Sequence, residues 1–314
     1  MENLIFSLNA TIPVFFTMLM GLFFRRIGLF DEALIRRLNQ FVFKAALPVL
    51  LFLDISGADF YQVWDTSFVL FCFLVTLLSI SLAAVLSLFI KNKSIQGEFI
   101  QAAYRSSAAI LGIAFIQNIY GNAGMAPLMI IGSVPLYNIM AVLVLSFFQP
   151  ERGKLNRQLL IKTGREILTN PIILGIVVGL IWSVFKLPRP QILLKTANNL
   201  SVLATPLGLM AMGASFDLKK ALSGLGSVML AGILKLIGLA CLFLPIAIAL
   251  GFRESYLVAI LVMLGSPTTV SCYIMAKNMG HEGSFTSAAV MLTTLLSAFT
   301  LTGWLYLLRS LGLI

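Results

Sequence analysis

The chain has 314 residues, of which 59% are hydrophobic and 11% charged, with a formal net charge of +10 and a mean hydropathy of +0.99. A soluble domain is about 45–50% apolar and about 25% charged, so this composition excludes a soluble globular protein and indicates a protein built for a lipid bilayer. The three cysteines lie in apolar runs and there is a single histidine, so we expect no disulfide framework, bound metal or other cofactor.

Runs of about 18–25 apolar residues predict ten transmembrane helices. The first run is taken as a span and not as a cleaved leader, because Arg25 and Arg26 follow it. Between the fifth and sixth runs lies the only sizeable linker, residues 149–167, so we expect one five-helix unit at 1–148 and another at 168–314. In chain order the spans are expected at residues 4–24, 40–56, 66–90, 98–117, 125–148, 168–186, 192–215, 225–250, 255–277 and 285–308.

The lysines and arginines in the loops and near the span ends are divided unequally between the two sides of this topology. Fourteen fall on the side of the linker and five on the opposite side. Because cytoplasmic loops carry the excess of basic residues, the linker is predicted to be cytoplasmic and both termini extracytoplasmic, in a multi-pass protein of the plasma membrane. The fourteen are Arg25, Arg26, Arg36, Arg37, Lys91, Lys93, Arg152, Lys154, Arg157, Lys162, Arg165, Lys219, Lys220 and Lys277; the five are Lys186, Arg189, Lys195, Arg253 and Arg309. This pattern also explains the net charge without a nucleic-acid partner.

The two halves coincide when the sequence is shifted by 158 residues. An odd number of spans in each half means that the second half is inserted upside down relative to the first, which is an architecture of transporters. The fold class we predict is therefore an all-α polytopic membrane protein with two inverted five-helix repeats. The matching positions that shape the backbone are Pro13 with Pro171, Gly21 with Gly179 and Pro48 with Pro206.

Several spans contain residues that interrupt helices. Pro48 and Pro206 are expected to break the second span of each half, because proline removes a helical hydrogen bond. A third break is expected at Pro267 in the ninth span, and its counterpart lies in the fourth span. Two broken helices that cross near the membrane midplane would direct half-helix N-termini at a bound anion. An alternative is that the serine and threonine hydroxyl groups around these breaks only form hydrogen bonds with the backbone or with neighbouring helices. The substrate-binding candidates are Arg105, Ser106, Ser107, Gly112, Ser266, Pro267, Thr268, Thr269 and Ser271.

Three basic residues lie inside the predicted spans. Lys44 is only roughly 6 Å from its span end and is expected to snorkel to the interface, with packing against Asp54 as the alternative. Arg105 and Lys235 are roughly 12 and 15 Å deep, where a charge is costly. Arg105 is assigned to substrate, whereas Lys235 is left open between a functional and a supporting role. Asp54 and Glu98 are placed at the margins of their spans and no carboxylate in mid-membrane, so a buried proton relay or a carboxylate-rich sodium site is poorly supported. Deep positive charge without deep negative charge favours an anionic solute.

Three stretches resemble the auxin efflux carrier family of permeases, whose bacterial members include malate and malonate carriers. They are GLFFRRIGLFDEALIRRLNQFVFKAALPVLLF at 21–52, NPIILGIVVGL with ATPLGLMAMGASF between 170 and 216, and SPTTVSCYIMAKNMG at 266–280. The resemblance implies a fold related to bile-acid sodium symporters, with substrate beside the crossover of the fourth and ninth spans. The chain has Ser107 where members often carry asparagine and Ala114 where they often carry proline.

These observations predict a secondary active carrier for a small organic anion of the carboxylate class, working by alternating access. The rival hypothesis is a membrane receptor or channel-like protein that keeps the fold without coupled transport. No catalytic, metal-binding or phosphate-binding motif is found, so an enzyme is not expected. The sequence leaves open which ion, a proton or sodium, is coupled, the direction of transport, and whether the chain forms a homodimer.

Overall fold

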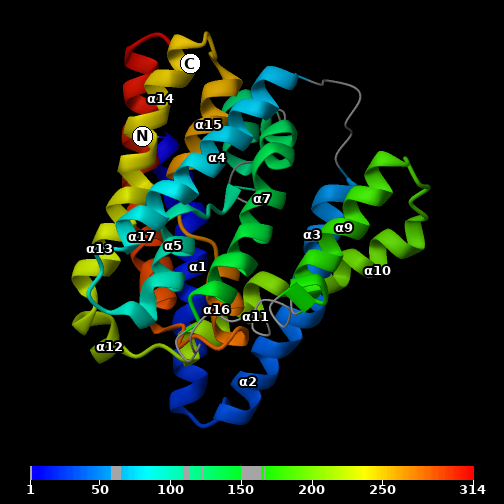
Figure 1. Ribbon diagram of the computed structural model, residues 1–314, viewed down its shortest axis with the longest axis vertical. Helices are drawn as coiled ribbons and strands as arrows, with labels where there is room; N and C mark the ends of the chain where they lie inside the picture. Colours follow the sequence, from blue (N-terminus) through cyan, green and yellow to red (C-terminus); the bar gives the residue numbers. More distant parts are fainter. Residues whose placement is uncertain (1, 58–64, 109–112, 122–123, 150–163, 166) are drawn as a thin grey trace.

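The architecture is known from a computed structural model, which describes residues 2–57, 65–108, 113–121, 124–149, 164–165 and 167–314. Every regular element in these residues is helical (Figure 1). Most helices begin and end close to the bounds of the apolar runs, but the helix of the second run begins at Glu32, well before the expected residue 40. Five uninterrupted helices in the described part of the chain are long and apolar enough to cross a membrane.

Some apolar runs form one helix and others form two short ones. Single helices are α1 (Glu2–Arg26), α4 (Thr66–Ser87), α7 (Ala126–Phe147), α9 (Pro171–Val184) and α17 (Ser284–Ser310). Two more run on through a π-helical turn: α2 (Glu32–Phe41), η1 (Val42–Ala46) and α3 (Leu47–Ser56), and likewise α13 (Leu225–Ile233), η4 (Leu234–Gly238) and α14 (Leu239–Ala249). Interrupted pairs are α5 (Gln96–Tyr104) with α6 (Ile113–Tyr120), α10 (Gln191–Ser201) with α11 (Ala204–Ala214), and α15 (Ser255–Gly265) with α16 (Ser271–Asn278), while α12 (Leu218–Ser223) is a short connector.

The two prolines expected to break helices behave differently. The expected break at Pro48 is wrong: the helix stays continuous from Glu32 to Ser56. It widens just before the proline, where the Leu47 N–H bonds to the carbonyl of Val42, five residues back. A π turn displaces the carbonyls that the proline ring would otherwise meet, so the helix passes the proline without stopping. Before Pro206 the helix does stop, at the turn between α10 and α11.

Glycines allow α1 and α11 to approach until their backbones touch. A Cβ atom on Gly21 would lie 2.0 Å from the carbonyl oxygen of Met210, and one on Gly213 would lie 1.9 Å from that of Met18. No side chain fits at either position. Close backbone approach through small residues is how helices associate where lipid removes the hydrophobic driving force.

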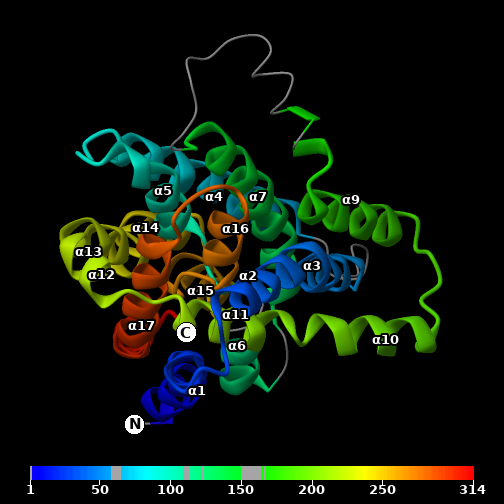
Figure 2. The same cartoon turned by 90° about the horizontal axis from the view of Figure 1, so that it is seen from below.

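Helices α3 and α9 are joined in the same way. A Cβ atom on Gly175 would lie 2.5 Å from the carbonyl oxygen of Pro48, and one on Gly179 would lie 3.2 Å from that of Phe52. Together with α10 these helices form one side of the molecule, and α13, α14 and α17 lie on the other (Figures 1 and 2). Between the two sides lie the broken helices, which position the site described next.

Candidate functional site

The two interrupted helices α5–α6 and α15–α16 meet at their breaks. The backbone N–H of Ser107 donates to the carbonyl of Pro267 over 3.0 Å. The hydroxyl of Thr268 donates to the carbonyl of Ala102 over 2.8 Å. Backbone groups that lose their helical hydrogen bonds at one break therefore bond to groups of the other break. Such bonds allow extended backbone inside a membrane protein.

A cavity of about 160 Å³ lies beside this crossing. A water needs about 10–15 Å³ measured in this way, so the cavity has room for a small solute. It is lined by the two breaks and by helices from both ends of the sequence. The candidates from sequence that line it are Arg105, Ser106, Ser107, Pro267, Thr268, Thr269 and Ser271.

The Arg105 guanidinium is the principal charge of the site. It is 2% exposed and directly follows α5. One nitrogen, Nη2, donates to Asn138 Oδ1 over 2.7 Å and to Ser271 Oγ over 2.9 Å, and Nη1 lies 2.9 Å from the Met275 sulfur. Among the described residues no carboxylate forms an ion pair with Arg105, and its Nε has no hydrogen-bond partner. The positive charge is therefore held in place by neutral groups alone.

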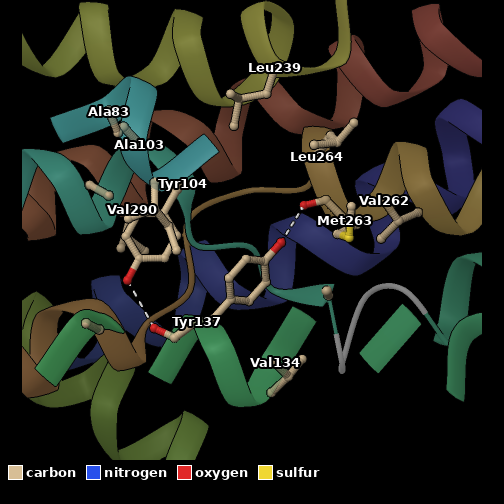
Figure 3. Packing of buried hydrophobic residues seen from close by; sticks show 14 of the residues in the cluster. Ala83, Ala103, Tyr104, Val134, Tyr137, Leu239, Val262, Met263, Leu264 and Val290 are labelled. Carbon is tan, nitrogen blue, oxygen red and sulfur yellow. Dashed lines mark hydrogen bonds between the residues drawn. The ribbon is translucent and has the colours of Figure 1, made fainter. Parts of the chain in front are cut away.

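Two tyrosines support the wall of the cavity. Tyr104 donates its hydroxyl to the carbonyl of Tyr137 over 3.0 Å, and Tyr137 donates to the carbonyl of Met263 over 3.1 Å. Figure 3 shows this chain of bonds running from α5 through α7 to α15. The hydroxyl of Ser106 donates to the same Met263 carbonyl. The last carbonyls of α15, which have no partner in their own helix, are therefore satisfied by side chains.

Lys235 lies behind the crossing and does not line the cavity. Its side chain is fully buried in the π turn η4, and its Nζ donates to the carbonyl of Leu264. That carbonyl belongs to the last turn of α15, where the helix dipole is negative. The ammonium thus neutralises the end of a half-helix, which is a supporting role.

The remaining predicted residues that the structure describes are absent from the cavity lining. Ser266 is buried with its Oγ unpartnered among the described residues, and Lys44 is exposed on η1. Pro48 and Pro206 are not in the lining, although the residues before them, Leu47 and Thr205, are. Gly112 lies outside the described residues.

Several lining residues were missed from the sequence: Asp54, Tyr137, Asn138, Thr205 and Thr294. Asn138 could have been predicted, because it is the single side-chain amide in the apolar run 125–148. Asp54 was placed at a span margin, whereas the structure brings it to the cavity from α3.

The arrangement is suited to a small anion. A fixed guanidinium, several hydroxyl groups and the N-terminus of α16 converge on one cavity, and each is favourable for negative charge. No group of three His, Cys, Asp or Glu side chains that could hold a metal ion occurs in the part of the chain that the structure describes.

Comparison with known proteins identifies a related family and a relative. A family model described as "Membrane transport protein" matches residues 6–305. The chain is also 24% identical over 292 residues to a protein of Rhizobium meliloti (strain 1021) described as "Putative malonate transporter". This match covers 87% of both chains.

Proposed function

Because the chain belongs to the membrane transport protein family, we propose that it is a secondary active carrier that moves a small organic anion by alternating access. The substrate class in this proposal is a carboxylate. The observation that carries it is Arg105, a buried cation that borders the cavity without a carboxylate partner among the described residues. The similar protein of Rhizobium meliloti is described as "Putative malonate transporter", and malonate is a carboxylate.

The proposal includes two inverted five-helix repeats, at 1–148 and 168–314, joined by a cytoplasmic linker at 149–167. The glycine contacts support it. Gly21 contacts Met210 and Gly179 contacts Phe52, and a shift of 158 residues converts each of these pairs into the other. Related contacts at related positions are expected when two copies of one unit pack against each other upside down.

We propose that both termini are extracytoplasmic and that the protein lies in the plasma membrane. Both chain ends lie toward one end of the molecule, and the turn from α1 to α2 lies at the other (Figure 1). The test is labelling of single cysteines in intact cells, after the exposed Cys241 and the buried Cys72 and Cys272 have been replaced. A cysteine at the N-terminus should react with an impermeant reagent, and one in the linker should not. The reverse pattern would overturn this orientation.

The substrate proposal is tested by malonate binding and flux with the purified protein in liposomes. Arg105→Lys keeps the charge but loses the planar fork that matches a carboxylate. We expect both Arg105→Lys and Arg105→Ala to weaken binding by about 1–3 kcal/mol, which is roughly 5- to 150-fold in Kd. Lys44→Gln, which removes an exposed cation outside the cavity, is the control and should behave as wild type.

The outcomes separate the hypotheses. Malonate flux that depends on Arg105 supports a carrier. Binding without flux would favour the receptor hypothesis, and wild-type binding by Arg105→Lys would move the anion site away from Arg105. If neither malonate nor other mono- and dicarboxylates bind, the carboxylate class is wrong.

A further inference from the structure

A second charged group faces the cavity, and the proposed function does not use it. Asp54 lies in α3 near its C-terminal end and lines the same cavity as Arg105. Its helix is otherwise apolar at the cavity, where Leu47, Leu50 and Leu51 are its neighbours in the lining. Within the described residues, no hydrogen bond or ion pair holds the Asp54 carboxylate. A carboxylate that lines a cavity between transmembrane helices and is not fixed by a partner indicates a functional group.

Among the described residues, few charged and titratable groups lie around Asp54. Helix α9, the main partner of α3, carries no titratable side chain. The other elements near Asp54 carry five charged or titratable side chains among the described residues. They are Lys44 on η1, Lys195 on α10, Arg189 in the loop before α10, and Arg105 and Tyr137 across the cavity.

Of these groups, only Arg105 has a permanent charge and lines the same cavity as Asp54. Lys44 and Lys195 are both exposed at the surface. Arg189 lies beside Gly57, where its Nη1 is 3.4 Å from the position of an added Cβ, one helical turn beyond Asp54. Among the described residues, the lining of the cavity therefore includes one cation and one anion, which come from different parts of the chain and do not form an ion pair.

We propose that Asp54 carries a coupling proton, so that the organic anion and one proton occupy the cavity together. This inference rests on the proposed function. While Asp54 is ionised, its charge opposes that of Arg105, and an incoming carboxylate meets no net attraction. Once Asp54 is protonated, Arg105 is an unmatched cation in a medium of low dielectric constant, where charge interactions are strong. Anion binding and proton binding therefore favour each other.

The chemistry of the step is a reversible proton transfer. A proton from water on one side of the membrane forms an O–H bond on a carboxylate oxygen of Asp54, and this bond breaks when the proton leaves to water on the other side. A sodium ion fits the place less well, because hard cations need several oxygen ligands. No second carboxylate lines the cavity among the described residues, and the nearest lining residues on α3 are leucines.

The test uses the full-length protein in liposomes, with radiolabelled malonate as the probe and a pH-sensitive dye in the lumen. External pH is held fixed, so that the ionisation of external malonate is the same throughout, and only luminal pH is changed. For wild type we expect malonate uptake to be accompanied by proton entry and to increase when the lumen is made more alkaline. Asp54→Asn should keep malonate–malonate exchange, while proton entry falls to the level of protein-free liposomes.

Two further variants make the result specific. Asp54→Glu keeps an ionisable group and should keep proton entry, whereas Asp54→Ser repeats the neutral substitution with a smaller side chain if the asparagine variant does not fold. Glu32→Gln removes an exposed carboxylate far from the cavity and should retain wild-type coupling.

The proposal is overturned if the Asp54→Asn protein still moves protons with malonate as wild type does. It is also overturned if wild-type uptake responds to a sodium gradient and not to luminal pH. Either result leaves the carrier proposal intact, because malonate flux is still observed. Absence of flux for every carboxylate in wild type would instead contradict the proposed function itself.

Discussion

Glu98 is predicted to be the side chain that fixes the start of α17 against α5. It is 1% exposed and accepts three hydrogen bonds from a segment more than 180 residues away. Oε1 accepts the N–H of Gly283 over 3.0 Å, and Oε2 accepts the N–H and the hydroxyl of Thr286 over 2.9 and 2.7 Å. These N–H groups belong to the first turn of α17, where helical donors have no partner in their own helix and negative charge is favoured.

The cost of Glu98→Gln follows from this geometry. An amide offers one acceptor oxygen where the carboxylate offers two, and its NH₂ group then faces an N–H donor. The least costly arrangement keeps both bonds to Thr286 and leaves the Gly283 N–H unpaired in a buried place. A bond to a charged group contributes about 1.5–3 kcal/mol, and the bonds that remain lose their charge, so we expect a loss of about 2–4 kcal/mol in unfolding free energy.

The assay is reversible unfolding of the purified protein in mixed micelles, with helix content followed against denaturing detergent. Thr286→Val removes only the hydroxyl bond to the carboxylate and should cost about 1.5 kcal/mol, the lower end of the range for a bond to a charged group. Glu32→Gln, at an exposed ion pair, should cost less than about 0.5 kcal/mol. A Glu98→Gln protein as stable as Thr286→Val would refute the reasoning, because it would show that the backbone donors of α17 do not depend on the carboxylate.

Three further predictions concern the packing and the crossing. Gly213→Ala should destabilise the protein by about 2 kcal/mol or more in the same assay, because the new methyl group overlaps backbone of α1, whereas Gly226→Ala, in open space, should be neutral or slightly stabilising. Lys235→Met should leave the carbonyl of Leu264 without its donor and reduce malonate flux more than malonate binding; equal losses of both would contradict a supporting role. Pro267→Ala should impair flux while membrane insertion is retained, and wild-type flux in this variant would mean that the proline is only a packing kink.

The sequence by itself determined the helices and most of their ends. Hydropathy predicts helices in a membrane protein because the bilayer forces every backbone group to bond within its own segment. The same local logic located the breaks near Pro206 and Pro267. It failed at Pro48, because the π turn Val42–Ala46 lets the helix continue past the proline. Nothing in the residue pattern distinguishes that outcome from a break.

The tertiary structure alone decided which groups meet in the cavity. Arg105 was found from sequence because a deep charge is conspicuous in an apolar run, but its partners Asn138 and Ser271 lie 33 and 166 residues away. From the sequence, Asp54 and Glu98 were both interpreted as ordinary residues at the margins of their spans. Their roles depend on helices that cross at places set by glycine contacts and by exchanged backbone bonds. Hydropathy acts along one helix, whereas a binding site is formed by contacts between helices, and only the packed structure specifies those.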